Sequence, residues 1–249
     1  AKSKNMVSIR VLESVGTHYA QDGLTNFGFD AAKHLPYLPM ALGAGSVTPL
    51  QMADGYAVFA NGGYRVNPTL VLKVTDGRGH VLAQYRPNVL DESMRGINAR
   101  NAFVMNSLLQ EVARTGTAAR AQATLKRPDL YGKTGTTNDS MDAWFAGYHP
   151  HLVAVVWIGY DQPRKLGDRE TGGGLALPVW IDYMTTALRN VPVTELSPPE
   201  GVVNIGGEWF YEEYTRSSGV RDVGLQSDEA EEGAPSAPSA TEKNDILDL

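Results

Sequence analysis

The chain has 249 residues, of which 42% are hydrophobic and 20% are charged, as in an ordinary globular protein. It contains no cysteine, which excludes disulfides and thiolate metal sites. Residues 225–249 hold seven acidic residues and one lysine, which accounts for the whole net charge of −6. The rest of the chain is neutral, so we expect no basic face for nucleic acid.

Apolar residues at helical spacing predict four amphipathic helices, over residues 6–15, 48–62, 98–114 and 178–188. Gly16 is a suitable stop for the first of them. The second begins with Thr48, a good N-cap residue, and Pro49, which fits the first helical turn.

The strands are predicted from apolar runs and short turns. Two runs, over residues 70–76 and 80–85, flank a Gly-Arg-Gly turn and predict a β-hairpin. Three later runs predict antiparallel strands, because only short connectors separate them: residues 130–135, 143–148 and 152–160. Residues 152–159 form the longest apolar run, which is far shorter than the ~20 residues that span a bilayer. The predicted fold class is α+β, an antiparallel sheet flanked by helices.

The composition divides the chain into three parts. Residues 1–190 carry the predicted elements. Residues 191–224 are expected to form a linker, proline-rich up to residue 203, and a short segment at 208–214 that is either a strand or a docking segment. Residues 225–249 have no aromatic residue and many acidic, alanine, serine and proline residues, which predicts a disordered acidic tail.

Residues 133–137, Lys-Thr-Gly-Thr-Thr, form a candidate anion and acyl-group receptor. A strand lysine supplies a fixed cation, and Gly135 lets a ligand approach the strand edge closely. The hydroxyls of Thr134 and Thr136 can hold a carboxylate, and backbone N–H groups can stabilise an oxyanion. Taken alone, the triplet is also compatible with a solvated turn that carries a surface lysine.

Ser3-Lys4-Asn5 precedes the first predicted helix and is a second candidate motif. Its simplest interpretation is a helix N-cap. However, class A β-lactamases and penicillin-binding proteins carry the motifs S-x-x-K, S-D-N and K-T-G. The last two occur here in that order, with Lys4 in place of the aspartate.

With these motifs, the chain resembles the transpeptidase domain of class A, bifunctional penicillin-binding proteins of the 1a type. Five blocks resemble that family in its order, covering roughly residues 1–188: SKNMVSIRVLESVG, GAGSVTPLQMADGYAVFANGGY, RTGTAARA, GKTGTTNDSMDAWFAGYHPHLVAVVWIGYD and ETGGGLALPVWIDYM. The resemblance implies a penicillin-binding, serine β-lactamase-like fold. It also implies peptidoglycan D,D-transpeptidase activity with D-Ala-D-Ala stem peptides and β-lactams as ligands, and no metal or cofactor.

Carried over by position, the resemblance implies that eight residues form the site: Ser3, Asn5, Lys133, Thr134, Gly135, Thr136, Thr137 and Asn138. The Ser3 hydroxyl would relay protons, the Asn5 amide would hold the substrate or a lysine, and Lys133 would help to poise the proton-transfer network. The hydroxyls of Thr134 and Thr136 would hold the substrate carboxylate, and the Thr136 N–H would form half of an oxyanion hole. Thr137 and Asn138 would border the site.

The chain departs from the family pattern at the nucleophile. No serine in residues 1–249 is followed by lysine three positions later. Because S-x-x-K precedes S-x-N in the family, we expect it upstream of Ala1, together with the first strands of the sheet, a glycosyltransferase domain and a membrane anchor. The chain alone would then be inactive, with a strand edge and apolar faces left uncovered. The whole protein would work at the periplasmic face of the bacterial inner membrane.

Two rival functions remain open. A D,D-carboxypeptidase or β-lactamase would share the motifs and pass the acyl group to water. A non-catalytic scaffold would instead dock envelope partners through residues 208–214 and the acidic tail.

Two other features are expected to play no part in the chemistry. His149 and His151 are expected to be surface residues of a hairpin connector, and Trp144 and Trp157 are expected to lie in the core. The three glycines at 172–174 are expected to form a tight loop. The family resemblance implies that this loop lies near the cleft, which leaves open a minor role at the edge of the substrate.

Overall fold

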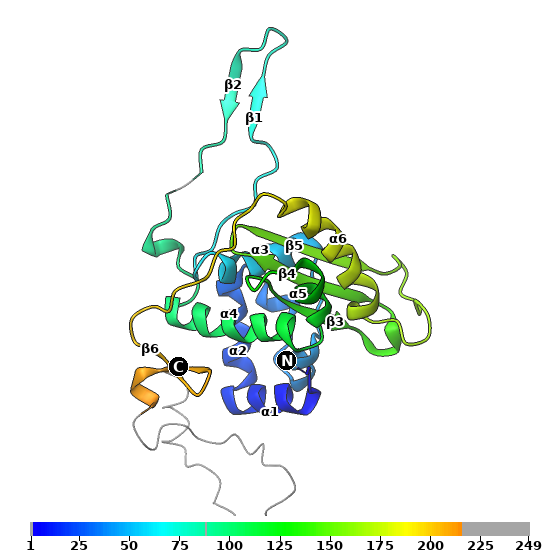
Figure 1. The fold of residues 1–249 in the computed structure, drawn as a ribbon. Helices are drawn as coiled ribbons and strands as arrows, with labels where there is room; N and C mark the ends of the chain where they lie inside the picture. The colour runs from blue at the N-terminus through cyan, green and yellow to red at the C-terminus, as the bar shows by residue number, and fades with distance from the viewer. Residues whose placement is uncertain (1, 88, 216–249) are drawn as a thin grey trace, which may run out of the picture.

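A three-stranded antiparallel sheet, in the order β3-β4-β5, lies at the centre of the computed structural model, which describes residues 2–87 and 89–215 (Figure 1). The strands are β3 (Tyr131–Thr136), β4 (Ala143–His149) and β5 (Leu152–Ile158). Helices cover both faces of this sheet, so the predicted α+β class is confirmed. No helix in the described ranges is both long and apolar enough to cross a membrane.

One face of the sheet packs against α5 (Ala119–Leu125) and α6 (Leu177–Ala187). Trp180 of α6 is 1% exposed and contacts the ring of Phe145 edge-on, at 5.0 Å between centroids. Its indole N–H donates to the carbonyls of Gly147 (3.3 Å) and Ala154 (3.1 Å). The small residues of β4 and β5 therefore allow a large aromatic side chain to lie directly on the backbone of the sheet.

The other face packs against α3 (Pro49–Ala60). This helix begins with a capping box, in which Thr48 accepts from the Gln51 N–H and the Gln51 side chain accepts from the Thr48 N–H. Tyr56 contacts Tyr148 edge-on, and Tyr148 stacks on Tyr131 with centroids 5.0 Å apart. The predicted helix over residues 48–62 is thus confirmed, and its aromatic face holds it on the sheet.

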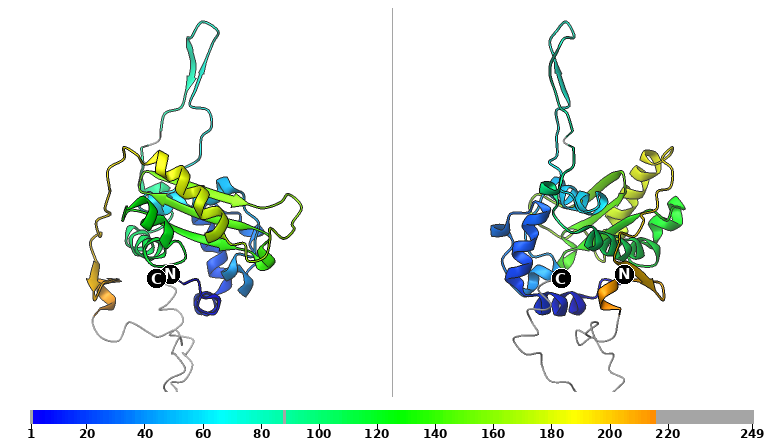
Figure 2. Two further views of the ribbon diagram at one scale, coloured as in Figure 1. Left: turned by 45° about the vertical axis from the view of Figure 1, so that its right-hand side comes forward. Right: turned by 90° about the vertical axis from the view of Figure 1, so that its left-hand side faces the viewer.

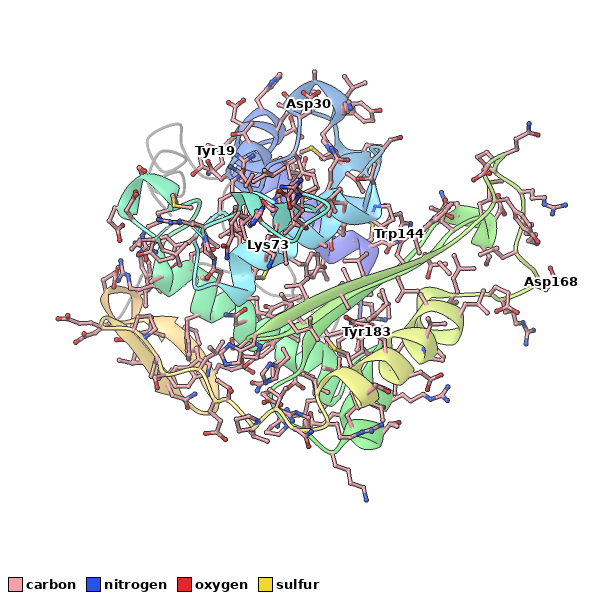
Figure 3. The ribbon with its side chains drawn as sticks, turned by 90° about the horizontal axis from the view of Figure 1, so that it is seen from above. Tyr19, Asp30, Lys73, Trp144, Asp168 and Tyr183 are labelled. Atoms are coloured by element: carbon pink, nitrogen blue, oxygen red, sulfur yellow. The ribbon has the colours of Figure 1, made fainter. Side chains whose placement is uncertain are left out.

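The N-terminal segments lie beyond α3, on the same side of the sheet (Figure 2). They comprise α1 (Asn5–Val15), α2 (Thr17–Gly23) and three short 3-10 turns, η1 (Leu24–Phe27), η2 (Ala31–Lys33) and η3 (Leu38–Leu42). Figure 3 shows Trp144 of β4 on the side of the sheet that faces these segments, and Tyr183 of α6 on the opposite side. The predicted helix over residues 6–15 is α1.

A β-hairpin of β1 (Lys73–Thr75) and β2 (Val81–Gln84) projects from the body of the protein (Figures 1 and 2). The Asp76 carboxylate closes its turn by accepting from the N–H groups of Arg78 and His80. Every residue of both strands is exposed. The hairpin prediction is confirmed, although the paired strands are shorter than the apolar runs.

The chain then returns through η4 (Glu92–Met94) to α4 (Ala99–Arg114), which packs against β3. After α6, a second hairpin of β6 (Val202–Ile205) and β7 (Glu208–Tyr211), followed by η7 (Glu212–Tyr214), docks on α4. Phe103 contacts Trp209 edge-on, and Arg100 forms an ion pair with Glu213 at 2.8 Å. Residues 208–214 thus contain a strand, β7, which also docks on α4. The segment expected to be a linker is without helix or strand only up to β6, which begins at Val202. The predicted disordered tail, residues 225–249, lies outside the described residues.

His149 is fully buried, so the prediction that both histidines are surface residues is wrong for it. Its Nε2 lies 3.0 Å from the buried carboxylate of Asp129, which also accepts from Arg127 (2.8 and 3.0 Å) and from the Thr194 N–H (2.8 Å). Arg127 in turn donates to two carbonyls of the segment that follows α6. The acidic partner, Asp129, lies 20 residues earlier in the chain, too far away for a local sequence pattern to indicate it.

Candidate active site

Lys133 and Ser3 meet, although 130 positions separate them in the chain. The Lys133 Nζ donates to the Ser3 Oγ and to the Thr134 carbonyl, both at 2.9 Å. Burial lowers the pKa of Lys133, which brings the amine closer to the neutral form that accepts a proton. The two candidate motifs therefore form one polar pair.

The residues that lead into α1 hold Ser3 in place. Ser3 has a φ of 51°, a left-handed conformation that is uncommon for serine. Asn5 begins α1 and is exposed. The turn between them brings the Ser3 hydroxyl to the sheet, while α1 continues away from it.

Thr134 and Thr136 alternate with Lys133 along β3, so their side chains leave the strand on the opposite face. The Thr134 Oγ1 lies 2.8 Å from the Thr117 Oγ1, in the turn between α4 and α5. The Thr136 Oγ1 accepts from the Gly172 N–H at 3.0 Å. A hydroxyl that accepts still has its own proton to donate, and in a hydroxyl pair one proton stays available. Both threonine positions can therefore donate to an anion.

The end of β3 is fixed by Asp142. The Thr137 Oγ1 accepts from the Asp142 N–H at 2.7 Å, and the Asp142 carboxylate accepts from the Trp157 indole at 2.7 Å. Asn138 begins η5 (Asn138–Ser140) and is exposed. Of the two residues predicted to border the site, Thr137 lines the cavity described next, and Asn138 is not among its lining residues.

A cavity of about 450 Å³ lies against the α3 side of β3. Its walls are residues 133–137, the indoles of Trp144 and Trp157, Met52 and Tyr56 of α3, and the loop after η3. Trp157 is 36% exposed, Trp144 is only partly buried, and neither belongs to a buried core cluster. Both indoles line the cavity, so the prediction that the two tryptophans lie in the core is wrong. The sequence pattern correctly predicts that both tryptophans lie on strands. It does not predict the cavity, because α3, which is distant in the chain, forms one of its walls.

A π-helical turn, η6 (Gly172–Ala176), presses on β3 from the face that carries Thr134 and Thr136. A Cβ on Gly172 would lie 2.2 Å from the Trp144 carbonyl oxygen and 2.4 Å from that of Gly135. The expected tight loop is therefore a helical turn, and glycine is required because no side chain fits there.

Sequence reasoning missed two residues that shape this site, Thr117 and Asp142. Thr117 stands in the Arg-Thr-Gly-Thr block and contacts Thr134, and Asp142 directly precedes β4 and contacts Thr137. Gly172 was expected near the cleft from the family resemblance, but its contact with Thr136 was not predicted. No local pattern links Thr117 or Gly172 to β3.

Comparison with known proteins identifies the family. The family described as penicillin binding protein transpeptidase domain matches residues 1–184. The chain belongs to the penicillin-binding protein transpeptidase family. The fold predicted from the resemblance is therefore confirmed.

Its relatives include penicillin-binding proteins 1A, in agreement with the 1a-type resemblance. The protein of that name from Neisseria flavescens is 48% identical over 217 residues, which cover 87% of this chain and 27% of the relative. The one from Pseudomonas aeruginosa is 41% identical and covers 82% of this chain and 30% of the relative. The chain thus spans less than a third of the length of these penicillin-binding proteins.

Solved structures of penicillin-binding proteins share the fold. Penicillin-binding protein 1A from Haemophilus influenzae superimposes with a TM-score of 0.80 at 32% identity, over 84% of this chain and 38% of that one. The PonA1 protein from Mycobacterium tuberculosis, solved in complex with penicillin V, gives a TM-score of 0.53 at 25% identity, over 74% of this chain and 52% of that one.

Proposed function

We propose that the whole protein that carries this chain is a peptidoglycan D,D-transpeptidase. A serine oxygen attacks the carbonyl carbon of the penultimate D-alanine of a stem peptide. The amide bond to the terminal D-alanine breaks, and that residue leaves as the protonated amine. An amine of a neighbouring stem then attacks the acyl-serine ester, forms the cross-link and restores the serine hydroxyl.

The observation that carries this proposal is the hydrogen bond between the Lys133 Nζ and the Ser3 Oγ. It joins the two candidate motifs beside a cavity, and the lysine has a lowered pKa. We assign Lys133 and Ser3 to proton transfer to the leaving amine and from the incoming one. Asn5, two residues after Ser3, is assigned to substrate holding.

The threonines of β3 form the proposed carboxylate receptor. Thr136 has a proton to donate, as does one hydroxyl of the Thr134–Thr117 pair, and Lys133 adds a positive charge close by. The terminal D-alanine carboxylate, or that of a β-lactam, would bind there, with Gly135 leaving the strand edge open. The Thr136 N–H would stabilise the tetrahedral oxygen, a role in which one donor contributes about 10²–10³ in rate. Thr137 and Asn138 would border the ligand, with Thr137 nearer to it.

The nucleophile is proposed to lie in a part of the whole protein outside residues 1–249, because no serine in this sequence has the S-x-x-K spacing. Residues 1–249 alone would therefore form no acyl-enzyme. Residues 1–190 would be the C-terminal part of the transpeptidase domain, residues 191–224 a docking extension, and residues 225–249 an acidic tail available to envelope regulators. A membrane anchor outside this chain would hold the domain in the periplasm.

The test uses the whole protein, a fluorescent penicillin and purified stem peptides. The binding of penicillin V by PonA1 makes the first ligand a reasonable choice. We expect a covalent fluorescent adduct and peptide dimers, both lost when the S-x-x-K serine is replaced by alanine. Release of D-alanine without dimers would show a carboxypeptidase instead. No adduct and no peptide turnover would support the non-catalytic scaffold.

A further inference from the structure

A polar groove lies between the N-terminal segments and the C-terminal hairpin. It consists of two cavities of about 340 Å³ each, which share Asn26 and Gly96 as lining residues. Residues 93–98 line it along both parts, η1 and α2 contribute from one side, and β7 and η7 contribute to the second cavity. No residue that lines the groove also lines the cavity beside Lys133, so the proposed reaction does not account for it.

The wall of the polar groove consists mainly of neutral amide and hydroxyl side chains. Tyr19 of α2 is 50% exposed, and Asn26 and Asn67 are exposed as well. The Asn98 side-chain oxygen accepts from the Arg100 N–H at 2.8 Å, which leaves the amide N–H groups of Asn98 to donate. Amides and hydroxyls both donate and accept hydrogen bonds, as do the hydroxyls of a sugar. The wall therefore suits a ligand that carries many hydroxyl groups.

The charges of the groove wall are compensated within the protein. Three arginines line the groove, and each has an acidic neighbour: Arg95 pairs with Glu92 (2.6 Å), Arg100 pairs with Glu213 (2.8 Å), and Arg65 acts on Asp54. Burial raises the pKa of Asp54, and the positive charge of Arg65 opposes that rise. An anionic polymer would meet no uncompensated cation among these three arginines, which favours a neutral ligand.

Tyrosine rings line the second cavity of the groove. Arg100 lies over the Tyr211 ring at 4.6 Å, and Tyr214 stacks against Tyr211 with centroids 6.1 Å apart. Tyr19 lines the same cavity from α2, and Figure 3 shows it well apart from Trp144 of the cavity beside β3. The face of a sugar ring that carries C–H groups packs well on an aromatic ring, which is apolar and rigid. Rings and amides thus occur together, as saccharide binding requires.

We propose that the polar groove binds a neutral glycan strand of N-acetylated amino sugars. Two joined cavities suit a linear polymer, and each lies near the lower end of the roughly 300–1,000 Å³ of ligand sites. Sugar hydroxyls bond to the amides of Asn26 and Asn98, and the Tyr19 ring packs on a sugar face. The choice of N-acetylated amino sugars rests on the proposed function, because stem peptides are attached to such strands. The groove would hold the strand while its stem peptide enters the cavity beside Lys133.

The test is isothermal titration of the whole protein with chitotetraose, a neutral oligomer of N-acetylglucosamine. We expect a Kd on the order of 1 mM, and weaker binding of cellotetraose, which lacks the acetamido groups. Tyr19→Ala and Asn26→Ala should each raise the Kd about threefold to tenfold, because each removes a ring contact or a hydrogen bond. Tyr183→Ala removes a tyrosine of similar exposure (52%) from α6, is the matched control and should leave the Kd unchanged.

A second measurement separates the groove from the reaction site. In the double variant Tyr19→Ala/Asn26→Ala, we expect acylation by a fluorescent penicillin and turnover of free stem peptides at the rates of the unaltered protein. Cross-linking of stem peptides attached to a glycan polymer should fall severalfold. If the unaltered protein forms no adduct and turns over no peptide, the proposed function fails, and the titration still decides whether the groove binds a glycan.

Three results of the titration would overturn the proposal. No binding of chitotetraose at several times the expected Kd would show that the groove is not a glycan site. An unchanged Kd in both Tyr19→Ala and Asn26→Ala would place the glycan elsewhere on the protein. Equal binding of cellotetraose would show that the acetamido groups are not recognised, and that the ligand is not defined by N-acetylated amino sugars.

Discussion

Lys133 is placed where its charge is costly to stability. Burial lowers its pKa below the ordinary 10.5, so the folded state disfavours the protonated form. Below the lowered pKa both states carry the charge, and the burial penalty is fully present. The penalty disappears as the pH rises from the lowered pKa to 10.5, because only the unfolded chain binds the proton in that window. A residue kept at such a cost is a good candidate for function.

Replacing Lys133 by methionine separates stability from chemistry. At pH 7 we expect the free energy of unfolding to stay equal or to rise, since the buried charge is gone. Acylation of the whole protein by a fluorescent penicillin should fall about 10²–10⁴-fold, the usual contribution of a proton-transfer group. Lys165→Met, which removes a surface lysine paired with Asp168, is the control and should change neither. Normal acylation in Lys133→Met would remove this lysine from the mechanism.

Asp129 is the residue whose loss should harm stability most clearly. It is 1% exposed and binds Arg127, His149 and the Thr194 N–H together. Asp129→Asn leaves the Arg127 charge without its partner, so we expect a loss of about 3–5 kcal/mol in urea unfolding. Asp168→Asn breaks only the exposed pair with Lys165, and we expect a loss of less than about 1 kcal/mol. Similar losses in the two variants would mean that the buried network is not a structural support.

The same network predicts a dependence on acid. Burial is the main cause that lowers the pKa of His149, and Arg127 adds to it, while Asp129 acts in the opposite direction. In the unfolded chain His149 takes up a proton near pH 6.5, whereas in the folded protein it stays neutral to a lower pH. The free energy of unfolding therefore falls as the pH drops through 6.5. Burial would raise the pKa of Asp129, but the hydrogen bonds and charges around it prevail and lower it, so a further loss follows below pH 3.8.

This acid dependence is measured by urea unfolding between pH 7.5 and pH 5. The His149→Gln variant should be less stable at pH 7.5 but should show a flatter slope against pH. An equal slope in both proteins would assign the proton uptake to another group.

Among the elements, η6 determines the shape of the β3 edge. Gly172→Ala would place a methyl group within 2.4 Å of two carbonyl oxygens, so η6 must move away from β3. We expect a loss of about 1–3 kcal/mol, typical of overpacking, and slower penicillin acylation, because the Gly172 N–H would no longer reach Thr136. In the matched variant Gly174→Ala, the new atom meets only the Thr171 hydroxyl at 3.3 Å, and both effects should be small.

The elements also show what the sequence can reveal. The helices α1, α3, α4 and α6 and the three strands of the central sheet follow from apolar periodicity over ten or more residues, or from strand runs with short turns. The helices α2 and α5 were missed because each has seven residues and too few turns to show a period. That Ser3 and Lys133 belong to one site was implied by the family resemblance, but their hydrogen bond was not predicted. The contacts of Thr117, Gly172 and His149 depend on packing between segments that are distant in the chain, and no local pattern specifies them.

At the scale of the whole molecule, the described residues leave much apolar surface uncovered. In the described part of the chain no strand pairs with the outer edge of β3 or of β5. The large hydrophobic residues exposed on the N-terminal segments are Met6, Val7, Val11, Tyr19, Leu35, Tyr37, Leu38 and Leu42. We expect residues 1–249, expressed alone, to bind the dye ANS and to melt over a broad range, since such faces need a cover. A sharp cooperative melt with dispersed amide NMR signals would contradict this expectation.

The alternation of side chains along β3 has a consequence for how this protein can change over evolutionary time. Lys133 leaves one face of the strand, and Thr134 and Thr136 leave the other, while β4 fixes the register residue by residue. An exchange of one amino acid alters one position only. The insertion or deletion of a single codon between Tyr131 and Lys133 would turn every later side chain to the wrong face at once. Lineages that keep this site should therefore accumulate substitutions within β3 freely at some positions, while length variation is confined to the turns at its two ends.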